Sequence, residues 1–259
     1  MRGLYLSEGA MLVQQAQLQV ISNNLSNLRS TGFKRDHGVE TSFAEWMLHE
    51  LRPEPGPEKG GSLRPIGSIA HNVATRETVT AFTQGPLEVT DRQLDFALAG
   101  SGFFQVEGGE GILYTRNGRF ELNGEGVLVT AAEGFEVIGE GGSIQLATDD
   151  VTVMADGSIF YNDGMTYGEA SPGRLAIAVF EADAQIEKYG NNYFVTDAAE
   201  GGEDEFEVLS GFLEGSNVSL IREMTSLMAV RRSYEAAQKI MITYDQILNK
   251  AANELGSSA

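Results

Sequence analysis

Two segments with a seven-residue hydrophobic repeat, one near each end of the chain, constrain the fold most strongly. The first repeat consists of Leu4, Met11, Leu18 and Leu25. The second consists of Leu220, Leu227, Tyr234, Met241 and Leu248. A period of seven places apolar side chains along one seam of an α-helix, as in coiled coils. The pattern therefore predicts helices over residues 3–28 and 218–252.

Further apolar positions strengthen both seams. Ile21 and Leu28 fill intermediate positions of the first repeat. Val230, Ala237 and Tyr244 do the same in the second. Neither segment contains Pro, which would interrupt a helix. The two ends are therefore expected to pair in a coiled-coil-like bundle.

The middle of the chain has a different pattern. The protein contains 31 Gly among 259 residues, about 12% against a usual ~7%, which favours many turns. Short alternating runs are separated by Asn-Gly and Asp-Gly pairs at 117–118, 123–124, 156–157 and 163–164. The pair at 117–118 predicts a two-residue hairpin between the flanking strands. Residues 174–180 and 192–196 are also expected to be strands. The middle is thus predicted to be all-β.

A Pro-rich and Gly-rich segment separates the first helix from this β-region. Residues 49–67 hold four Pro and four Gly, a composition typical of an extended linker. Three parts are predicted: a helical domain of residues 1–35 and 217–259, an extended region of residues 36–72, and a β-rich domain of residues 73–216. The fold class is mixed α and β, with the β-domain inserted between the terminal helices.

No group of residues suits catalysis or a cofactor. The chain has no Cys, which excludes thiolate metal sites and a cysteine nucleophile. The three His residues lack helical metal-ligand spacing. The stretch "GSGFF" at 100–104 lacks the spacing of a nucleophile elbow, and "DGSIFYNDG" at 156–164 lacks the final Glu of a calcium loop. We expect no enzyme activity, no metal and no cofactor.

The net charge of −19 is unevenly distributed. Residues 1–35 carry four basic residues and one acidic residue, and residues 217–259 carry five and four. The residues between them therefore carry a net charge of −23. This acidity argues against nucleic acid and anionic lipid as partners. The nearly neutral ends are suited to packing against copies of themselves.

The first residues do not resemble a cleavable signal peptide. The stretch "MRGLYLSEGAMLVQQ" has no continuous apolar core and no small-residue cleavage site. No run approaches the ~18 apolar residues of a membrane span. If the protein leaves the cytoplasm, we expect a route without a cleaved signal, and we expect no membrane insertion.

Amphipathic helices at both ends permit two arrangements: a hairpin within one chain or a bundle between chains. The stretch "NNLSNLRSTGFKR" at 23–35 favours the second, because amides beside an apolar seam provide register when they bond to neighbouring subunits. The predicted assembly surface comprises Leu4, Met11, Leu18, Ile21, Asn23, Asn24, Leu25, Asn27, Leu28, Gly32, Phe33, Leu220, Leu227, Val230, Tyr234, Ala237, Met241, Tyr244 and Leu248.

Three long stretches carry a family resemblance. They are "ISNNLSNLRSTGFKRD" at 21–36, the segment from "LDFALAGSGFF" to "GFEVIG" at 94–139, and "LEGSNVSLIREMTSLMAVRRSYEAAQKIMITYDQIL" at 213–248. In this order and spacing the chain resembles the bacterial flagellar basal-body rod and hook proteins. It is most similar to rod proteins of the proximal and distal class, with the distal class slightly ahead.

The resemblance implies a structural protein that self-assembles into a helical filament crossing the periplasm. In this family the terminal helices form an inner tube that lines the export channel, and the β-domain forms the outer layer. The implied partners are other rod and hook proteins and the flagellar export apparatus. In distal rod proteins a stretch near the position of residues 49–67 stiffens the shaft. The implied function is torque transmission.

Two alternatives remain at this point. One is a hook or hook-like axial subunit, although hook proteins usually carry a larger middle region. The other, from a different class, is a secreted acidic β-domain that binds glycan or calcium and uses its helices only as a clasp.

Overall fold

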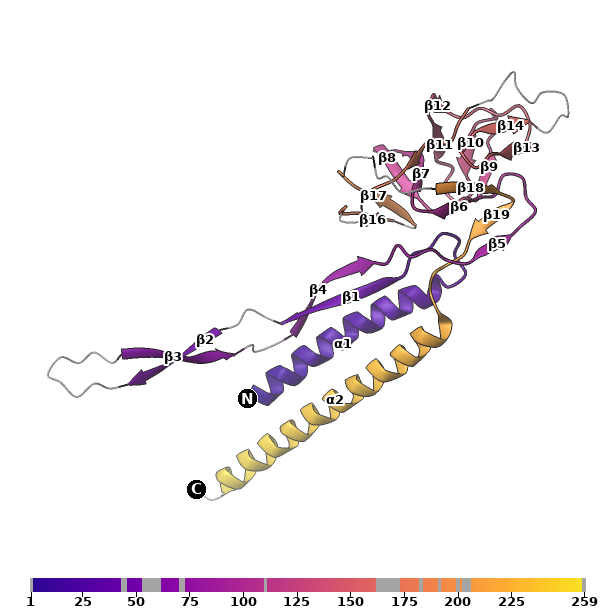
Figure 1. Cartoon of the computed structure of the whole chain (residues 1–259). Helices are drawn as coiled ribbons and strands as arrows, with labels where there is room; N and C mark the ends of the chain where they lie inside the picture. Colours follow the sequence, from indigo (N-terminus) through magenta and orange to yellow (C-terminus); the bar gives the residue numbers. More distant parts are fainter. Residues whose placement is uncertain are drawn as a thin grey trace. The chain divides into compact units, whose positions relative to one another are not determined.

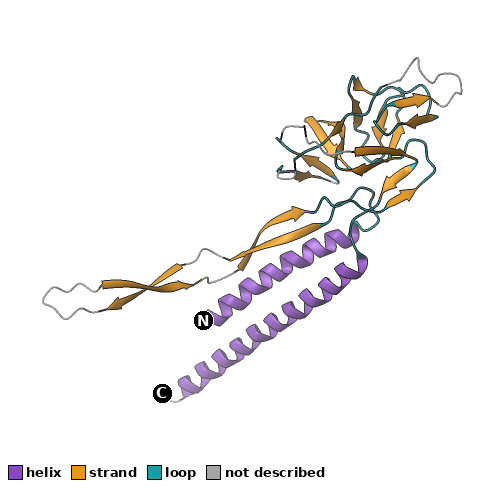
Figure 2. Cartoon of the chain, viewed as in Figure 1, coloured by secondary structure: helices purple, strands orange, loops and turns teal. Residues whose placement is uncertain are grey.

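A computed structural model describes residues 2–42, 46–52, 62–69, 73–109, 111–161, 173–181, 184–190, 192–198, 201 and 206–257. It contains an N-terminal helix, a β-rich middle and a C-terminal helix (Figures 1 and 2). This confirms the predicted mixed α and β fold. The coiled-coil pairing of the two helices is not confirmed by it.

Both predicted helices are present. Helix α1 spans Arg2–Ser26 and helix α2 spans Leu220–Ser257. Their ends differ from the predicted bounds by one to five residues, as expected for segments with a helical repeat and no Pro. At ~1.5 Å per residue, the 38 residues of α2 extend about 57 Å. No helix among the described residues has the length and apolar content needed to cross a membrane.

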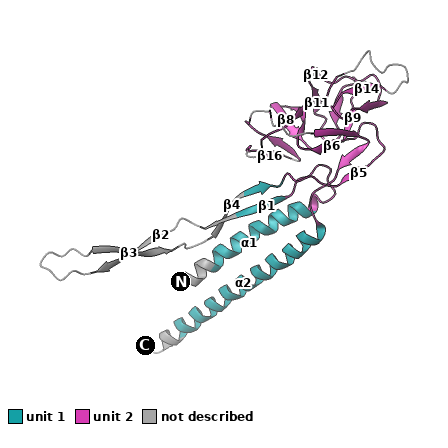
Figure 3. Cartoon of the chain, in the orientation of Figure 1, with its two compact units in different colours: residues 1–25, 36–81, 220–259 teal, residues 26–35, 82–219 magenta. Residues whose placement is uncertain are grey.

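The chain divides into two compact units (Figure 3). Unit 1 contains residues 1–25, 36–81 and 220–259, and unit 2 contains residues 26–35 and 82–219. This division differs from the predicted domains in three segments. Residues 217–219, expected in the helical domain, belong to the β-rich unit 2. Residues 26–35, expected in the helical domain, belong to the β-rich unit 2. Residues 36–81, expected in the extended region and the start of the β-domain, belong to unit 1 with the helices.

The strands of unit 1 form two antiparallel pairs. Strand β1 (Asp36–Ser42) pairs with β4 (Val73–Thr80), and β2 (Trp46–Arg52) pairs with β3 (Ser62–Ile69). The described parts of residues 49–67 are therefore paired strands rather than a plain linker, which corrects the prediction. Pro65 stands opposite His49 where the register shifts, a position that tolerates a residue without an N–H. The Pro-rich residues 53–57 lie outside the described residues.

Unit 2 is built on a nine-stranded sheet. Its main path has the order β16-β17-β8-β7-β11-β10-β9, with β12 beside β11 and β15 beside β7. The strands are β7 (Phe103–Gly108), β8 (Gly111–Thr115), β9 (Phe120–Leu122), β10 (Leu128–Thr130), β11 (Glu136–Gly139), β12 (Gly142–Ser143), β15 (Ile177–Ala178), β16 (Glu187–Tyr189) and β17 (Tyr193–Val195). All pairings in this sheet are antiparallel.

Three shorter antiparallel pairs complete unit 2. They are β6 (Phe96–Gly100) with β18 (Phe206–Ser210), β5 (Leu87–Val89) with β19 (Phe212–Glu214), and β13 (Val151–Val153) with β14 (Ile159–Tyr161). The β13–β14 hairpin turns at Asp156-Gly157, as predicted, with Gly157 at φ 88°. Strand β17 confirms the strand predicted at 192–196, whereas 174–180 holds only the two-residue β15. The pair at 163–164 lies outside the described residues.

The hairpin predicted at Asn117-Gly118 is wrong. Strand β8 pairs with β7 and β17, and β9 pairs with β10, so the strands flanking this pair do not bond to each other. Gly118 instead accepts a hydrogen bond from the backbone N–H of Phe96 at 2.9 Å. The Asn117 side chain accepts the N–H of Arg119 at 3.2 Å. The pair therefore lies in a connection between β8 and β9, two strands that do not pair with each other. The turn-forming residues alone do not distinguish such a connection from a hairpin.

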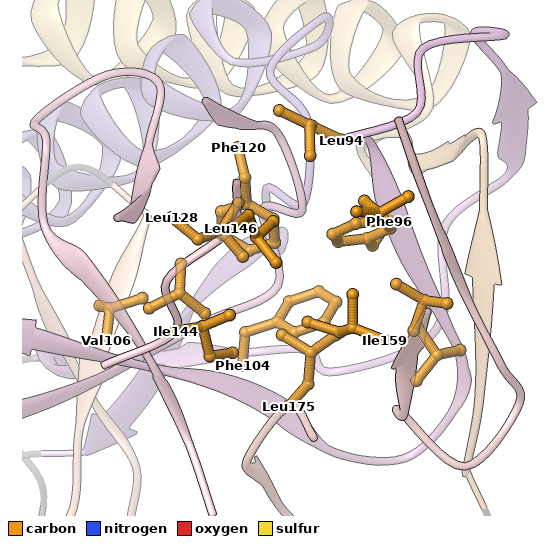
Figure 4. Close-up of a cluster of buried hydrophobic side chains, with 14 of the residues drawn as sticks. Leu94, Phe96, Phe104, Val106, Phe120, Leu128, Ile144, Leu146, Ile159 and Leu175 are labelled. Atoms are coloured by element: carbon orange, nitrogen blue, oxygen red, sulfur yellow. The ribbon is translucent and has the colours of Figure 1, made fainter. Parts of the chain in front are cut away.

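The main core of unit 2 gathers buried apolar side chains from most of its strands. Phe104 and Phe120 meet edge to face with ring centroids 5.3 Å apart, and Phe96 lies 5.9 Å from Phe120. Figure 4 shows Phe104, Ile159 and Leu175 converging on this interior. A second cluster contains Phe103, Tyr114, Ala178, Phe180 and Phe194. Unit 2 therefore has a hydrophobic core of its own, independent of the terminal helices.

Candidate assembly site

Helix α2 in unit 1 has one face that is covered more than the others. Ala237 is buried, and Leu227, Val230, Tyr234 and Met241 are partly buried. These five positions follow the predicted seven-residue repeat. The remaining predicted α2 positions are exposed: Leu220, Tyr244 and Leu248.

A second apolar stripe on α2 was missed by the repeat analysis. Ile221, Met224 and Met228 are 79%, 48% and 55% exposed. They stand at i, i+3 and i+7, so they share one side of the helix. Their apolar side chains could have indicated a second contact surface in the sequence. The repeat analysis missed them because they lie off the seam of Leu227, Tyr234 and Met241. Further along α2, the apolar residues Ile240, Ile242 and Ile247 are also exposed.

Helix α1 follows its predicted seam in the part whose side chains are described. Ile21 is buried, and Met11, Leu18 and Leu25 are partly buried. The side chain of Leu4 lies outside the described residues. The structure therefore places the α1 repeat on the less exposed side of the helix.

The polar residues at the end of α1 have separate roles. The Asn24 side chain is 1% exposed, donates to the carbonyl of Asp36 at 2.7 Å, and accepts the N–H of Asp36 at 2.9 Å. This pair joins α1 to the start of β1 within unit 1. Asn24 was predicted to bond to a neighbouring subunit, and the structure instead uses its amide within the chain. Asn23, one residue earlier, is exposed.

Replacing Asn24 with Ala is expected to lower the free energy of unfolding of unit 1 by about 1–3 kcal/mol, because the buried N–H and C=O of Asp36 lose their partner. Gln19→Ala, at an exposed position of the same helix, should change it by less than about 0.5 kcal/mol. Urea unfolding followed by fluorescence of Trp46, the only Trp and a residue of unit 1, measures both. Equal effects of the two substitutions would contradict the role given to Asn24.

Within unit 2, residues 31–35 bond directly to residues 214–217, and we call these contacts the clamp. The N–H of Gly32 donates to the carbonyl of Glu214 at 2.7 Å. The N–H of Arg35 donates to Oδ1 of Asn217 at 2.7 Å. In the sequence, the first segment follows α1 and the second precedes α2. The clamp therefore ties together the two chain segments that adjoin the helices.

A buried charge cluster lies at the centre of the clamp. Lys34 Nζ lies 2.5 Å from Oε1 of Glu214, and both side chains are 0% exposed. Arg116, 4% exposed, places Nη1 3.5 Å from Oε2 of the same carboxylate. Its guanidinium also lies 5.1 Å above the Phe103 ring. Glu214 accepts a further hydrogen bond from the N–H of Gly85 at 2.8 Å.

Burial dominates the electrostatics of the two cations. It lowers the pKa of Lys34 below the ordinary value of 10.5, and the attraction of Glu214 offsets part of that effect. Burial likewise lowers the pKa of Arg116, with Glu214 acting in the opposite direction. Glu214 is thus the anion that makes both buried charges tolerable.

Gly32 and Phe33, both predicted on the assembly surface, are buried inside unit 2. Gly32 has φ +68°, and a Cβ there would lie 2.5 Å from the backbone carbon of Arg116. The ammonium of Lys188 lies 4.3 Å from the Phe33 ring centroid. Both residues therefore serve the clamp, not an exposed interface. No local pattern in the sequence indicates this, because the partners lie far along the chain.

Two other predicted positions also fall in unit 2. Asn27 accepts a hydrogen bond from the Ser30 hydroxyl at 3.1 Å, in the turn that follows α1. Leu28 is partly buried. Among the residues that the structure describes, no group of three or more acidic or His side chains is arranged to hold a metal.

Three family models match the chain. Residues 4–34 match "Flagella basal body rod protein", residues 97–161 match "Flagellar hook protein FlgE/F/G D1 domain", and residues 209–255 match "Flagellar basal body rod FlgEFG protein C-terminal". The first match includes residues 31–34 of the clamp, and the last match includes residues 214–217.

Curated relatives align over nearly their whole length. The flagellar basal-body rod protein FlgG of Agrobacterium fabrum is 32% identical, over 98% of this chain and 100% of the relative. FlgF of Caulobacter vibrioides is 30% identical, over 98% and 97%. The flagellar hook-basal body complex protein FlhO of Bacillus subtilis is 29% identical, over 99% of each. The chain therefore belongs to the flagellar basal-body rod protein family.

Proposed function

We propose that this chain is a structural subunit of the flagellar basal-body rod and that it polymerises through α1 and α2. The observation that carries the proposal is the exposed stripe of Ile221, Met224 and Met228 on a helix whose seam lies on another side. Apolar stripes of this kind mark protein–protein contact surfaces. The relatives named above are rod proteins, which supports the same conclusion.

The geometry of α2 favours more than one neighbour. At about 100° per residue, the seam through Leu227, Tyr234 and Met241 and the stripe through Ile221, Met224 and Met228 point about 110° apart. One partner helix covers only one of these directions. Two apolar sides therefore call for a packed tube of helices, in which each α2 meets at least two neighbours. Copies meeting through unlike surfaces generate an open helical filament.

The clamp provides a path for mechanical load. It bonds the segment after α1 and the segment before α2 to each other and, through Arg116, to strand β8. Force applied to either helix then reaches the sheet of unit 2 through buried contacts. On this proposal the helices form the tube that lines the export channel, and unit 2 forms the outer layer of a torque-transmitting shaft.

The remaining parts of the proposal follow from family membership. Partners are other copies, neighbouring rod and hook proteins, and the flagellar export apparatus that delivers the chain to the cell envelope. A hook-like role has no better support than a rod role. The ligand-binding alternative lacks a supporting observation in the described residues, which contain no cluster of metal ligands.

The test is to locate the epitope-tagged protein in purified basal bodies and to identify the rod components that co-fractionate with it. We expect the protein in the rod fraction, and we expect cells lacking its gene to make no complete hook and not to swim. An intact basal body without the protein, or normal swimming of the deletion strain, would refute the rod assignment. Complementation with the wild-type chain is the control.

A further inference from the structure

We propose that Glu214 is a folding latch, through which unit 2 closes its core only after the segments around residues 34, 116 and 214 have met. The inference does not rest on the proposed function. It starts from the buried cluster of one carboxylate and two cations, whose members are separated by 180 and 98 residues along the chain.

The charges make the three segments interdependent. Lys34 and Arg116 without Glu214 would be two buried cations with no counter-charge. Glu214 without them would be a buried anion. Removing one partner of a buried pair is strongly unfavourable because the remaining charge is desolvated without compensation. The cluster is therefore favourable only when it is complete.

The cluster is also connected to the core of unit 2. Arg116 follows β8, a central strand of the sheet, and its guanidinium packs over Phe103 of the second core cluster. Closing the sheet around Phe103 takes Arg116 out of water. Core formation without Glu214 thus carries the cost of a buried guanidinium that has no counter-charge.

Glu214 also bonds to the backbone of two segments, one through its carboxylate and one through its carbonyl. Its carboxylate accepts the N–H of Gly85, and its carbonyl accepts the N–H of Gly32. These bonds fix the segments before β5 and after α1 at the same point. A chain that has not yet supplied residues 212–217 lacks the strand partner of β5 and the only anion of the cluster. In such a chain we expect the core of unit 2 to remain unformed. Contacts between distant segments form late because closing the long loops between them costs entropy.

The test compares refolding of the full chain and of Glu214→Gln from urea by pulsed hydrogen exchange. Four amides are followed: Gly32 and Gly85, which bond to Glu214, and Phe96 and Leu128, which bond within the core. We expect Glu214→Gln to slow protection of all four together, by about tenfold. Glu88→Gln, which removes an exposed carboxylate on β5, is the matched control and should refold at the wild-type rate.

Protection of Phe96 and Leu128 at the wild-type rate, with delay only at Gly32 and Gly85, would overturn the proposal. The clamp would then be added to a core that folds without it. If Glu214→Gln does not refold, Lys34→Met decides, because it leaves Glu214 paired with Arg116. Slowing of all four amides by about threefold or more supports the latch, and an unchanged rate at the two core amides refutes it.

Discussion

Replacing Gly118 with Ala is expected to prevent unit 2 from folding. A Cβ at this position would lie 1.6 Å from the carbonyl oxygen of Phe96 and 2.7 Å from its carbonyl carbon. The two nearest atoms are both backbone, so movement of a side chain does not relieve the clash. The same two residues are joined by the hydrogen bond from Phe96 N–H to the Gly118 carbonyl, and Phe96 is 0% exposed in the core. Relief of the clash therefore requires separating β6 from the crossing at 117–118.

The expected cost is about 4 kcal/mol or more, at the upper end of single substitutions. Gly124→Ala is the matched control: a Cβ there meets nothing within 4 Å, and Gly124 is not among the glycines with positive φ. Near-ultraviolet circular dichroism and urea unfolding of the full chain measure both variants. The control should resemble wild type. A Gly118→Ala protein with wild-type stability would mean that the backbone approach at Phe96 is not as close as the structure shows.

Features with a local cause were predictable from the sequence. Both terminal helices follow from their repeats and lack of Pro, and the turn at Asp156-Gly157 follows from a pair that accommodates positive φ. The apolar repeat of α2 also identified Leu227, Val230 and Ala237, which lie on its less exposed side. In each case the deciding interaction lies within a few residues of the pattern, so the pattern contains the information.

Features that depend on distant partners were not predictable. Asn24 looks like one of several similar amides, and only the fold shows that its partner is the backbone of Asp36. Lys34 belongs to a stretch that was predicted to contact neighbouring subunits, yet it is buried against Glu214. Asn117-Gly118 has the composition of a hairpin turn, but Phe96 decides its conformation. A single sequence does not show which distant segments meet, and those meetings override local preference.

Replacing Leu227 with Asp is expected to abolish rod assembly and swimming while unit 2 stays folded. Leu227 lies on the partly covered seam of α2 in unit 1, outside the core of unit 2. In a packed tube of helices its side chain is removed from water, and a carboxylate there costs several kcal/mol per subunit. The penalty recurs in every copy, because each subunit of a filament contributes the same α2 surface.

Leu227→Met is the matched control, since it keeps an apolar side chain of similar volume at the same site and should cost less than about 1.5 kcal/mol. Cells carrying it should swim, whereas cells carrying Leu227→Asp should not. Near-ultraviolet circular dichroism of both purified proteins should show the tertiary signal of unit 2 unchanged, which separates an assembly defect from misfolding. Normal swimming with Leu227→Asp would show that the seam of α2 is not an assembly surface. If both apolar sides of α2 contact neighbouring subunits, cells with Leu227→Asp should lose swimming and cells with Leu227→Met should keep it.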